Sequence, residues 1–220
     1  PNRFITMVEV DGKIVRSHLP DPGRLKELLL SGADLLLRRA PKKSERKTKY
    51  STVMVRHEGQ LISLVSALPN RFVKESLQRG DLPMFKEFQY VRSEISHGNH
   101  RFDFLLKDKN EKPFYLEVKS VTYVENGLAK FPDAITARGT RHAEALSELV
   151  KEGNGAGILF VCQRFDANRF EPMWDRDLKF AKALLAAKQV GVKVWCVTTQ
   201  VSETEMTFEK VIPVNLTPPE

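Results

Sequence analysis

Cysteine is scarce in this chain of 220 residues, which contains only Cys162 and Cys196. Both lie inside apolar runs, GILFVCQ and VKVWCV, where a free thiol behaves as a small hydrophobic residue. Neither makes a metal-ligand spacing with another cysteine or a histidine, and the five histidines form no HxH or HExxH motif. We therefore expect two core thiols without a disulfide, and the sequence argues against a zinc enzyme.

Long apolar runs are also missing, and no stretch approaches the roughly 20 residues that cross a bilayer. No signal-peptide pattern opens the chain, although it begins at Pro1 rather than methionine and a removed targeting segment stays open. GxSxG and GKS/T motifs do not occur, which argues against the common serine hydrolases and P-loop enzymes. These absences predict a cytoplasmic protein with no membrane partner.

Positive charge is in excess, with 35 lysines and arginines against 28 acids. The excess is concentrated in residues 38–50, RRAPKKSERKTKY, where Glu45 is the one acid. Such clustering is typical of a surface that contacts polyanions, and the lack of an amphipathic helix around it favours nucleic acid over membrane. A solvated loop without a partner is the alternative. The predicted nucleic-acid contacts in this segment are Lys42, Lys43, Arg46, Lys47 and Lys49.

The first part of the chain has the pattern of an all-β unit. Residues 3–66 contain five short strand-like runs, and an Asp-Gly hairpin signal joins the first two. A short helix is expected over residues 22–30, where Arg24 is either a phosphate contact or an exposed helix-start residue. Five short strands with a helical interruption predict a small OB-like β-barrel, a fold that often binds nucleic acid.

Further along, helices alternate with strands. A helix over residues 70–80 is expected to connect the halves, because Gly80 and Pro83 would stop it. The expected later elements are strands at EISHG, HRFDFLL, FYLEVKS, GILFVCQ and VKVWCV, helices over 133–152 and 175–189, and a last hairpin over 204–214. Helices between apolar strands predict a partly parallel sheet covered on both faces. We thus predict an α/β chain, α+β overall, with an OB-like domain over 1–80 and a mixed-sheet domain over 81–220.

Two neighbouring predicted strands carry ionisable residues within apolar sequence. Asp103 is the one acid in HRFDFLL, and FYLEVKS places Glu117 and Lys119 on one strand face. The polar turn DKNEKP between the strands predicts an antiparallel hairpin that brings the three together. A lone buried acid is costly unless it is paired or metal-bound, and two carboxylates on neighbouring strands suit Mg²⁺ or Mn²⁺. The alternative is a cross-strand Asp–Lys pair with Glu117 in solvent.

This set of residues suits metal-assisted phosphodiester hydrolysis. Asp103, Glu117 and the backbone carbonyl of Val118 are expected to hold the metal, which lowers the pKa of a bound water. Lys119 is expected to orient that water or to neutralise the charge of the transition state. Glu94 is a further candidate metal ligand, although an exposed glutamate at a strand start explains it equally well.

An acid followed, after a hairpin, by ExK resembles the PD-(D/E)XK nuclease superfamily, a loose signature by itself. Longer words, among them HLPDPGR, LPNR, SEISHGNHRFDFLL and YLEVKSVTYVENGLAKFPDAITARGTRH, resemble the sugar fermentation stimulation protein family along nearly the whole chain. The resemblance implies an N-terminal OB-like domain, a C-terminal nuclease-like domain, DNA binding and a nuclease activity. The superfamily's metal-binding acids fall on Asp103 and Glu117, and its lysine on Lys119.

The family motif FPDAxTxRGxxH is also present in this chain, at residues 131–142. Its Pro132 and Asp133 are typical helix-start residues. Arg138 and His142 lie one turn apart on the predicted helix, which makes both of them candidate phosphate contacts. A surface pair without a ligand is the alternative.

The sequence therefore predicts a DNA-binding protein whose C-terminal half is a metal-dependent nuclease. Two other functions stay open: a non-enzymatic DNA-binding regulator that keeps the nuclease-like fold, and an RNA-processing nuclease, since an OB-like barrel does not choose between nucleic acids. The oligomeric state is also open.

Overall fold

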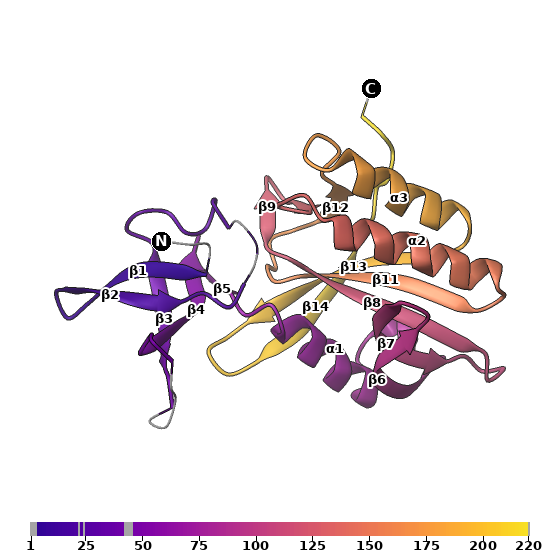
Figure 1. Cartoon of the computed structure of the whole chain (residues 1–220), viewed down its shortest axis with the longest axis horizontal. Helices are drawn as coiled ribbons and strands as arrows, with labels where there is room; N and C mark the ends of the chain where they lie inside the picture. Colours follow the sequence, from indigo (N-terminus) through magenta and orange to yellow (C-terminus); the bar gives the residue numbers. More distant parts are fainter. Residues whose placement is uncertain (1–3, 22, 24, 42–45, 220) are drawn as a thin grey trace.

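The computed structural model describes residues 4–219 except 22, 24 and 42–45. Its first five strands form one sheet of order β1-β2-β4-β3, with β5 paired to β4 (Figure 1). They are β1 (Ile5–Val10), β2 (Lys13–His18), β3 (Asp34–Arg39), β4 (Tyr50–His57) and β5 (Gln60–Ser63). All five predicted strands are thereby confirmed.

Two tight turns set the register of these strands. Asp11 and Gly12 both have positive φ, 52° and 73°, as the favoured two-residue hairpin turn requires. Glu58 and Gly59 make a similar turn between β4 and β5, with φ of 48° and 78°. The buried core of this sheet consists of Leu19, Leu25, Leu28, Val55, Ile62 and Leu64.

The helix expected over residues 22–30 is wrong for the described part of that segment. Residues 26–28 form a turn, in which the N–H groups of Leu28 and Leu29 both donate to the Leu25 carbonyl. Leu25 has a positive φ of 47°, which a right-handed helix does not contain. Because Leu25 and Leu28 are buried in the small core, packing rather than helix propensity shapes this turn.

The rest of the chain is built on a six-stranded mixed sheet of order β14-β13-β11-β8-β7-β6. Its strands are β6 (Gln89–His97), β7 (His100–Lys107), β8 (Pro113–Val121), β11 (Gly155–Cys162), β13 (Lys193–Val201) and β14 (Met206–Ile212). β8, β11 and β13 run parallel, and the other pairs are antiparallel. The predicted partly parallel sheet is confirmed.

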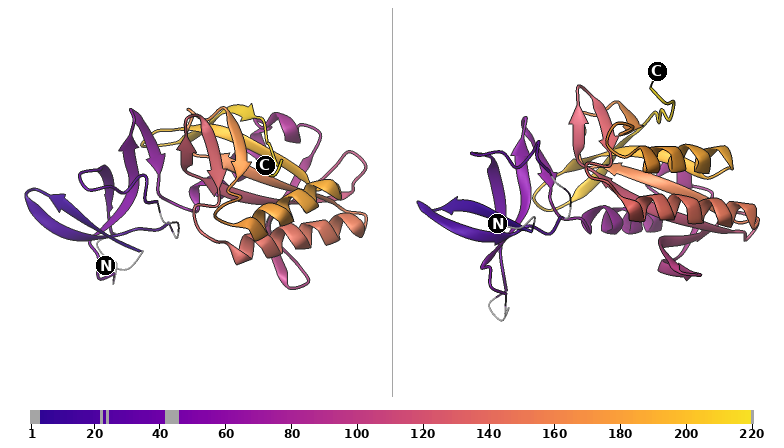
Figure 2. Two further views of the ribbon diagram at one scale, coloured as in Figure 1. Left: turned by 90° about the horizontal axis from the view of Figure 1, so that it is seen from above. Right: turned by 45° about the horizontal axis from the view of Figure 1, so that its top comes forward.

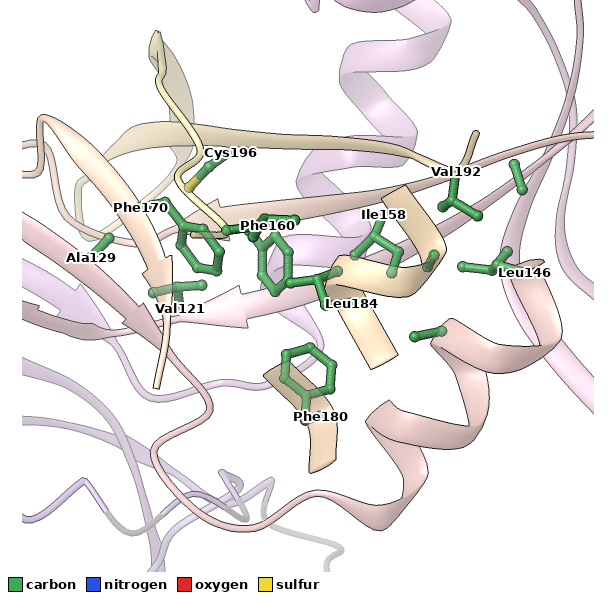
Figure 3. Packing of buried hydrophobic residues seen from close by; sticks show 14 of the residues in the cluster. Val121, Ala129, Leu146, Ile158, Phe160, Phe170, Phe180, Leu184, Val192 and Cys196 are labelled. Atoms are coloured by element: carbon green, nitrogen blue, oxygen red, sulfur yellow. The ribbon is translucent and has the colours of Figure 1, made fainter. Parts of the chain in front are cut away.

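Helices cover both faces of this sheet (Figures 1 and 2). They are α1 (Leu68–Arg79), α2 (Ala137–Lys151) and α3 (Leu178–Gln189), and a short 3₁₀ helix at Pro83–Phe85 follows α1. α2 and α3 lie side by side on one face, over a buried cluster that contains Phe160, Phe170 and Phe180 (Figure 3). In the described part of the chain, none of the helices has both the length and the apolar character needed to span a membrane.

The sequence places the start of α2 at Pro132 and Asp133, which is wrong. Thr136 is the N-cap, and its hydroxyl accepts a hydrogen bond from the Gly139 N–H at 3.0 Å. The cap residue is also bound to the start of α3, because the Thr136 N–H donates to Asp177 Oδ2 at 2.7 Å. A long-range partner therefore decides where α2 begins.

The structure contains three short strands that the sequence analysis does not predict. β9 (Tyr123–Glu125), β10 (Leu128–Phe131) and β12 (Arg169–Pro172) form a separate sheet of order β12-β10-β9. A turn at Asn126 and Gly127 joins β9 to β10. Strands of three or four residues are too short to show alternation in the sequence.

Helix α1 packs with the second sheet although it follows the first. Phe72 and Val73 lie in one buried cluster with Leu116 of β8. The helix ends at Gly80, as predicted, because this residue is left-handed with φ of 76°. We therefore place the boundary between the two domains before Leu68, rather than after residue 80 as the sequence predicts.

The β4–β5 turn of the first domain contacts the loop after β11. Arg164 is 2% exposed, and its guanidinium donates to Glu58 at 2.8 Å and to Asp166 at 2.5 Å. The Phe165 N–H donates to the side chain of Gln60 at 3.3 Å. These contacts, one of which is made by a buried arginine, join the two domains.

Candidate functional site

Asp103 and Glu117 lie on adjacent antiparallel strands, at the point where these strands part. The β7–β8 pairing ends at Phe104 and Leu116, which confirms the predicted hairpin. Beyond this pair, Asp103 Oδ2 accepts a hydrogen bond from the Val118 N–H at 2.7 Å. The carboxylate thus takes the place of a backbone acceptor at the end of the ladder.

Helix α1 supplies the second contact of Asp103. Asn70 Nδ2 donates to Asp103 Oδ1 at 2.6 Å, so both oxygens of this acid accept from uncharged donors. The sequence analysis missed Asn70. One polar residue in the first turn of an amphipathic helix gives no signal that it reaches an acid on a distant strand.

Glu117 is 3% exposed and lies between a lysine and a histidine. Its Oε1 accepts a hydrogen bond from Lys119 Nζ at 2.5 Å and contacts His142 Nδ1 of α2, also at 2.5 Å. Because an ionised carboxylate only accepts, His142 Nδ1 carries the hydrogen in this contact. The Lys119 side chain is 13% exposed, so the site opens to solvent on the lysine side.

The other oxygen, Glu117 Oε2, is buried and has no hydrogen-bond partner among the residues that the structure describes. An unpaired buried acceptor is costly, and a cation would satisfy it. Two carboxylates and a backbone oxygen form the donor set that Mg²⁺ and Mn²⁺ prefer. Within the described ranges no third acid, cysteine or histidine completes a metal-binding group, so water and a phosphate would have to fill the other positions.

The two acids have opposite pKa shifts. Burial and the nearby charge of Glu117 raise the pKa of Asp103 to about 6, against the lowering effect of its hydrogen bond from Val118 and of the charge of Lys119. Burial also acts to raise the pKa of Glu117, but the hydrogen bonds and charges of His142 and Lys119 outweigh it and hold that pKa below its usual range. Glu117 is therefore ionised at neutral pH, whereas Asp103 gains or loses its proton near pH 6.

The structure does not bring every predicted site residue to this centre. The Glu94 side chain is exposed and forms an ion pair with Arg101 on the neighbouring strand. Arg138 is exposed in the first turn of α2. His142 is 6% exposed and points at Glu117, so it does not lie on the surface beside Arg138 as the expected phosphate contact requires.

The predicted basic segment begins at the end of β3, which contains Arg38 and Arg39. Arg46, Lys47 and Lys49 are exposed, and Arg46 also donates to Ser51 Oγ at 3.3 Å. The remaining residues predicted to contact nucleic acid, which lie outside the described residues, are Arg24, Lys42 and Lys43.

The fold and the site define a two-domain α+β protein, in which an OB domain precedes a six-stranded mixed sheet that is covered by helices. Residues 1–64 match the family model described as the SfsA N-terminal OB domain, and residues 67–205 match that of the sugar fermentation stimulation protein RE domain. The chain belongs to the sugar fermentation stimulation protein family.

Curated relatives share most of their length with this chain. The sugar fermentation stimulation protein homolog of Clostridium tetani is 38% identical over 216 residues, which are 98% of this chain and 94% of the relative. The homolog of Moorella thermoacetica is 43% identical over 195 residues, 89% of this chain and 84% of the relative. The structure of Pyrococcus furiosus SfsA in complex with Ca²⁺ has the same fold, with a TM-score of 0.86, 24% identity and coverage of 97% of this chain and 91% of that one.

Proposed function

We propose that this protein is a metal-dependent nuclease that hydrolyses phosphodiester bonds in DNA at Asp103, Glu117 and Lys119. One observation carries the proposal: two carboxylates from neighbouring strands meet beside an ammonium group, and Glu117 Oε2 is buried without a partner. Two acids that hold a metal ion and a lysine beside them suit the stabilisation of the negative charge that develops on a phosphate when water attacks it.

Each residue of the site has a distinct role in this proposal. Asp103, Glu117 and the Val118 carbonyl would hold Mg²⁺ or Mn²⁺, which when bound supplies a Lewis acid and lowers the pKa of a water. Lys119 Nζ, which lies on the solvent side of Glu117, would orient that water and offset negative charge on the phosphate. His142 holds Glu117 from the buried side and keeps it ionised.

The solved relative supports a role for a divalent cation. The Pyrococcus furiosus SfsA structure was determined in complex with Ca²⁺, a hard ion that carboxylate oxygens bind. For this chain, the donor set of the site is the reason to expect Mg²⁺ or Mn²⁺.

A groove between the domains, with arginines along one side, supports nucleic acid as the partner. Arg38, Arg39 and Arg71 line a groove of about 660 Å³ over half-buried Leu36 and Met54, and two glutamates of the β13–β14 turn also line it. The groove includes the end of β3, which leads into the basic segment, and the start of α1, which carries Asn70. Phosphates would contact the arginine side, where binding would weaken with salt.

A cleavage assay tests the proposal. Plasmid and linear duplex DNA are incubated with the protein and Mg²⁺ or Mn²⁺, beside the Lys119→Ala variant and a control in which EDTA replaces the metal. We expect cleavage that requires the metal and that falls at least about a hundredfold in Lys119→Ala. Equal cleavage by the variant and the wild type would sink the assignment.

One observation favours a second function, a DNA-binding regulator without enzymatic activity. Lys119 Nζ is bound to Glu117 Oε1, so the lysine is engaged before any substrate arrives. Both functions predict DNA binding that weakens with salt. Only the nuclease predicts Mn²⁺ binding that is lost in Asp103→Asn and Glu117→Gln, which calorimetry measures, and competition between duplex DNA, single strands and RNA decides the preferred nucleic acid.

A further inference from the structure

Asn70 contacts the candidate metal site from outside the two strands that carry its acids. Its amide donates to Asp103 Oδ1 at 2.6 Å, while the Val118 N–H donates to Oδ2 at 2.7 Å. Because both oxygens are held, rotation of the carboxylate is restricted. The lone pairs that these bonds leave free therefore point in a fixed direction.

The uncharged character of this donor matters beside a cation. A lysine or arginine in its place would bind the carboxylate more strongly, but its positive charge would oppose a metal ion at the same oxygens. An amide favours the ionised form of Asp103 without cancelling its charge. Glu117 differs, because two other groups already meet its Oε1 and only Oε2 is left.

Asn70 is itself held in place. It lies in the first turn of α1, and the following Phe72 and Val73 are buried against the six-stranded sheet. The start of the helix is fixed by the Leu68 N–H, which donates to the Val65 carbonyl at 2.9 Å. The helix that follows the OB domain thus presents a rigid donor to the site.

We propose that Asn70 is a positioning residue, which orients Asp103 so that a divalent cation binds between Asp103 and Glu117. This inference rests on the proposed function and adds α1 to the elements that build the site. A purely structural role, in which Asn70 only fastens α1 to the sheet, predicts lost stability with unchanged metal affinity. Metal affinity therefore separates the two roles.

Calorimetric titration of the full chain with Mn²⁺ tests the proposal in three variants. Asn70→Leu keeps a similar volume but removes the donor. Asn70→His returns a ring N–H near the position of the lost amide. Gln78→Leu is the matched control, because it makes an amide-to-leucine change at an exposed position of the same helix.

We expect Asn70→Leu to bind Mn²⁺ about tenfold more weakly than the wild type, the lower end of the effect seen when a partner of a metal ligand is removed. Asn70→His should recover most of the affinity, and Gln78→Leu should match the wild type. If Asn70→Leu does not fold, as judged by circular dichroism, Asn70→Ala replaces it, since it also removes the donor.

Three results would overturn the inference in distinguishable ways. Wild-type affinity in Asn70→Leu removes the positioning role but leaves the proposed function in place, because the protein still binds the metal. A loss that Asn70→His does not restore assigns the effect to packing. Absence of Mn²⁺ binding by the wild type itself removes the metal site and the positioning role together.

Discussion

The charge of Asp103 lowers the stability of the metal-free fold at neutral pH. Burial and the charge of Glu117 raise its pKa to about 6, so at neutral pH the acid is mostly ionised in an environment that disfavours its charge. A bound cation would compensate that charge. Groups that are unfavourable for folding and shaped for a ligand are typical of functional sites.

Asp103→Asn should therefore stabilise the metal-free protein at neutral pH. A raised pKa in the folded state means that the fold binds the proton more tightly than the unfolded chain does, so stability is lost as pH rises through about 6. A neutral asparagine escapes this loss, and Asn70 can turn its amide to accept from it. We expect a gain of up to about 3 kcal/mol in unfolding free energy at about pH 7.5, measured by urea denaturation in EDTA.

The same comparison near pH 5 is the control for this prediction. There the wild-type acid is mostly protonated, so the advantage of Asp103→Asn should shrink. A variant that is less stable than the wild type at both pH values would show that the charge of Asp103 does not destabilise the fold.

Single residues of the site differ in how far the sequence predicts them. Alternation in FYLEVKS is sufficient to place Glu117 and Lys119 on one side of a strand, because a strand fixes the faces of its side chains. Helical spacing puts Arg138 and His142 on one stripe but does not say which of them is buried. Asn70 lies in LPNR, one of the segments that resemble the family, but no residue pattern predicts its contact with the site, since that contact depends on how α1 packs.

At the scale of the element, the start of α2 matters because this helix brings His142 to Glu117. Thr136→Ala removes the hydroxyl that accepts from the Gly139 N–H. We expect a loss of about 1 kcal/mol in unfolding free energy, and Thr136→Ser, which keeps the hydroxyl, should restore most of it. Urea denaturation of the three proteins measures this, and equal stability of the alanine and serine variants would speak against a capping role.

Elements defined by their own residues are predicted better than elements defined by distant partners. The end of α1 follows from Gly80, which takes the left-handed conformation that a helix end favours. The start of α2 depends on Asp177, which accepts from the Thr136 N–H across 41 residues of sequence. β10 similarly needs β9 and β12 on either side, and neither neighbour is long enough to be seen in the sequence.

At the scale of the whole molecule, Arg164 joins the OB domain to the sheet that carries the site. Arg164→Met removes the bond to Glu58 across the domains and two bonds to Asp166 within the loop. We expect a cost of about 1 to 3 kcal/mol, because hydrogen bonds between charged groups are the stronger kind. The OB domain should then unfold separately, which calorimetry would show as two transitions.

Glu58→Gln is the matched control for Arg164→Met, because it weakens only the bond across the domains. Its side chain is 65% exposed, so a smaller effect is expected. A single transition at the wild-type temperature in Arg164→Met would mean that other contacts, such as that of Phe165 with Gln60, already join the domains.

The order of the domains follows from the sequence, but their junction does not. Short strands in one half and alternating helices and strands in the other distinguish the two units. The sequence predicts a boundary after residue 80, whereas the packing of α1 leads us to propose one before Leu68. Phe72 and Val73 are apolar residues that either domain could have buried, so the sequence does not choose between the two positions. In the sequence, Arg164 is an ordinary charged residue that follows a strand, and nothing predicts its burial. It is buried in the structure, where it bonds to Glu58 of the other domain.

The measurement that tests the central claim most directly is anomalous diffraction from crystals soaked in Mn²⁺. We predict one peak between the carboxylates of Asp103 and Glu117, about 2.0–2.3 Å from an oxygen of each, with Lys119 Nζ beside the ion and not bound to it. Glu117→Gln crystals soaked in the same way should lack the peak. A wild-type map without density at this position, at a Mn²⁺ concentration that saturates binding in solution, would contradict the account.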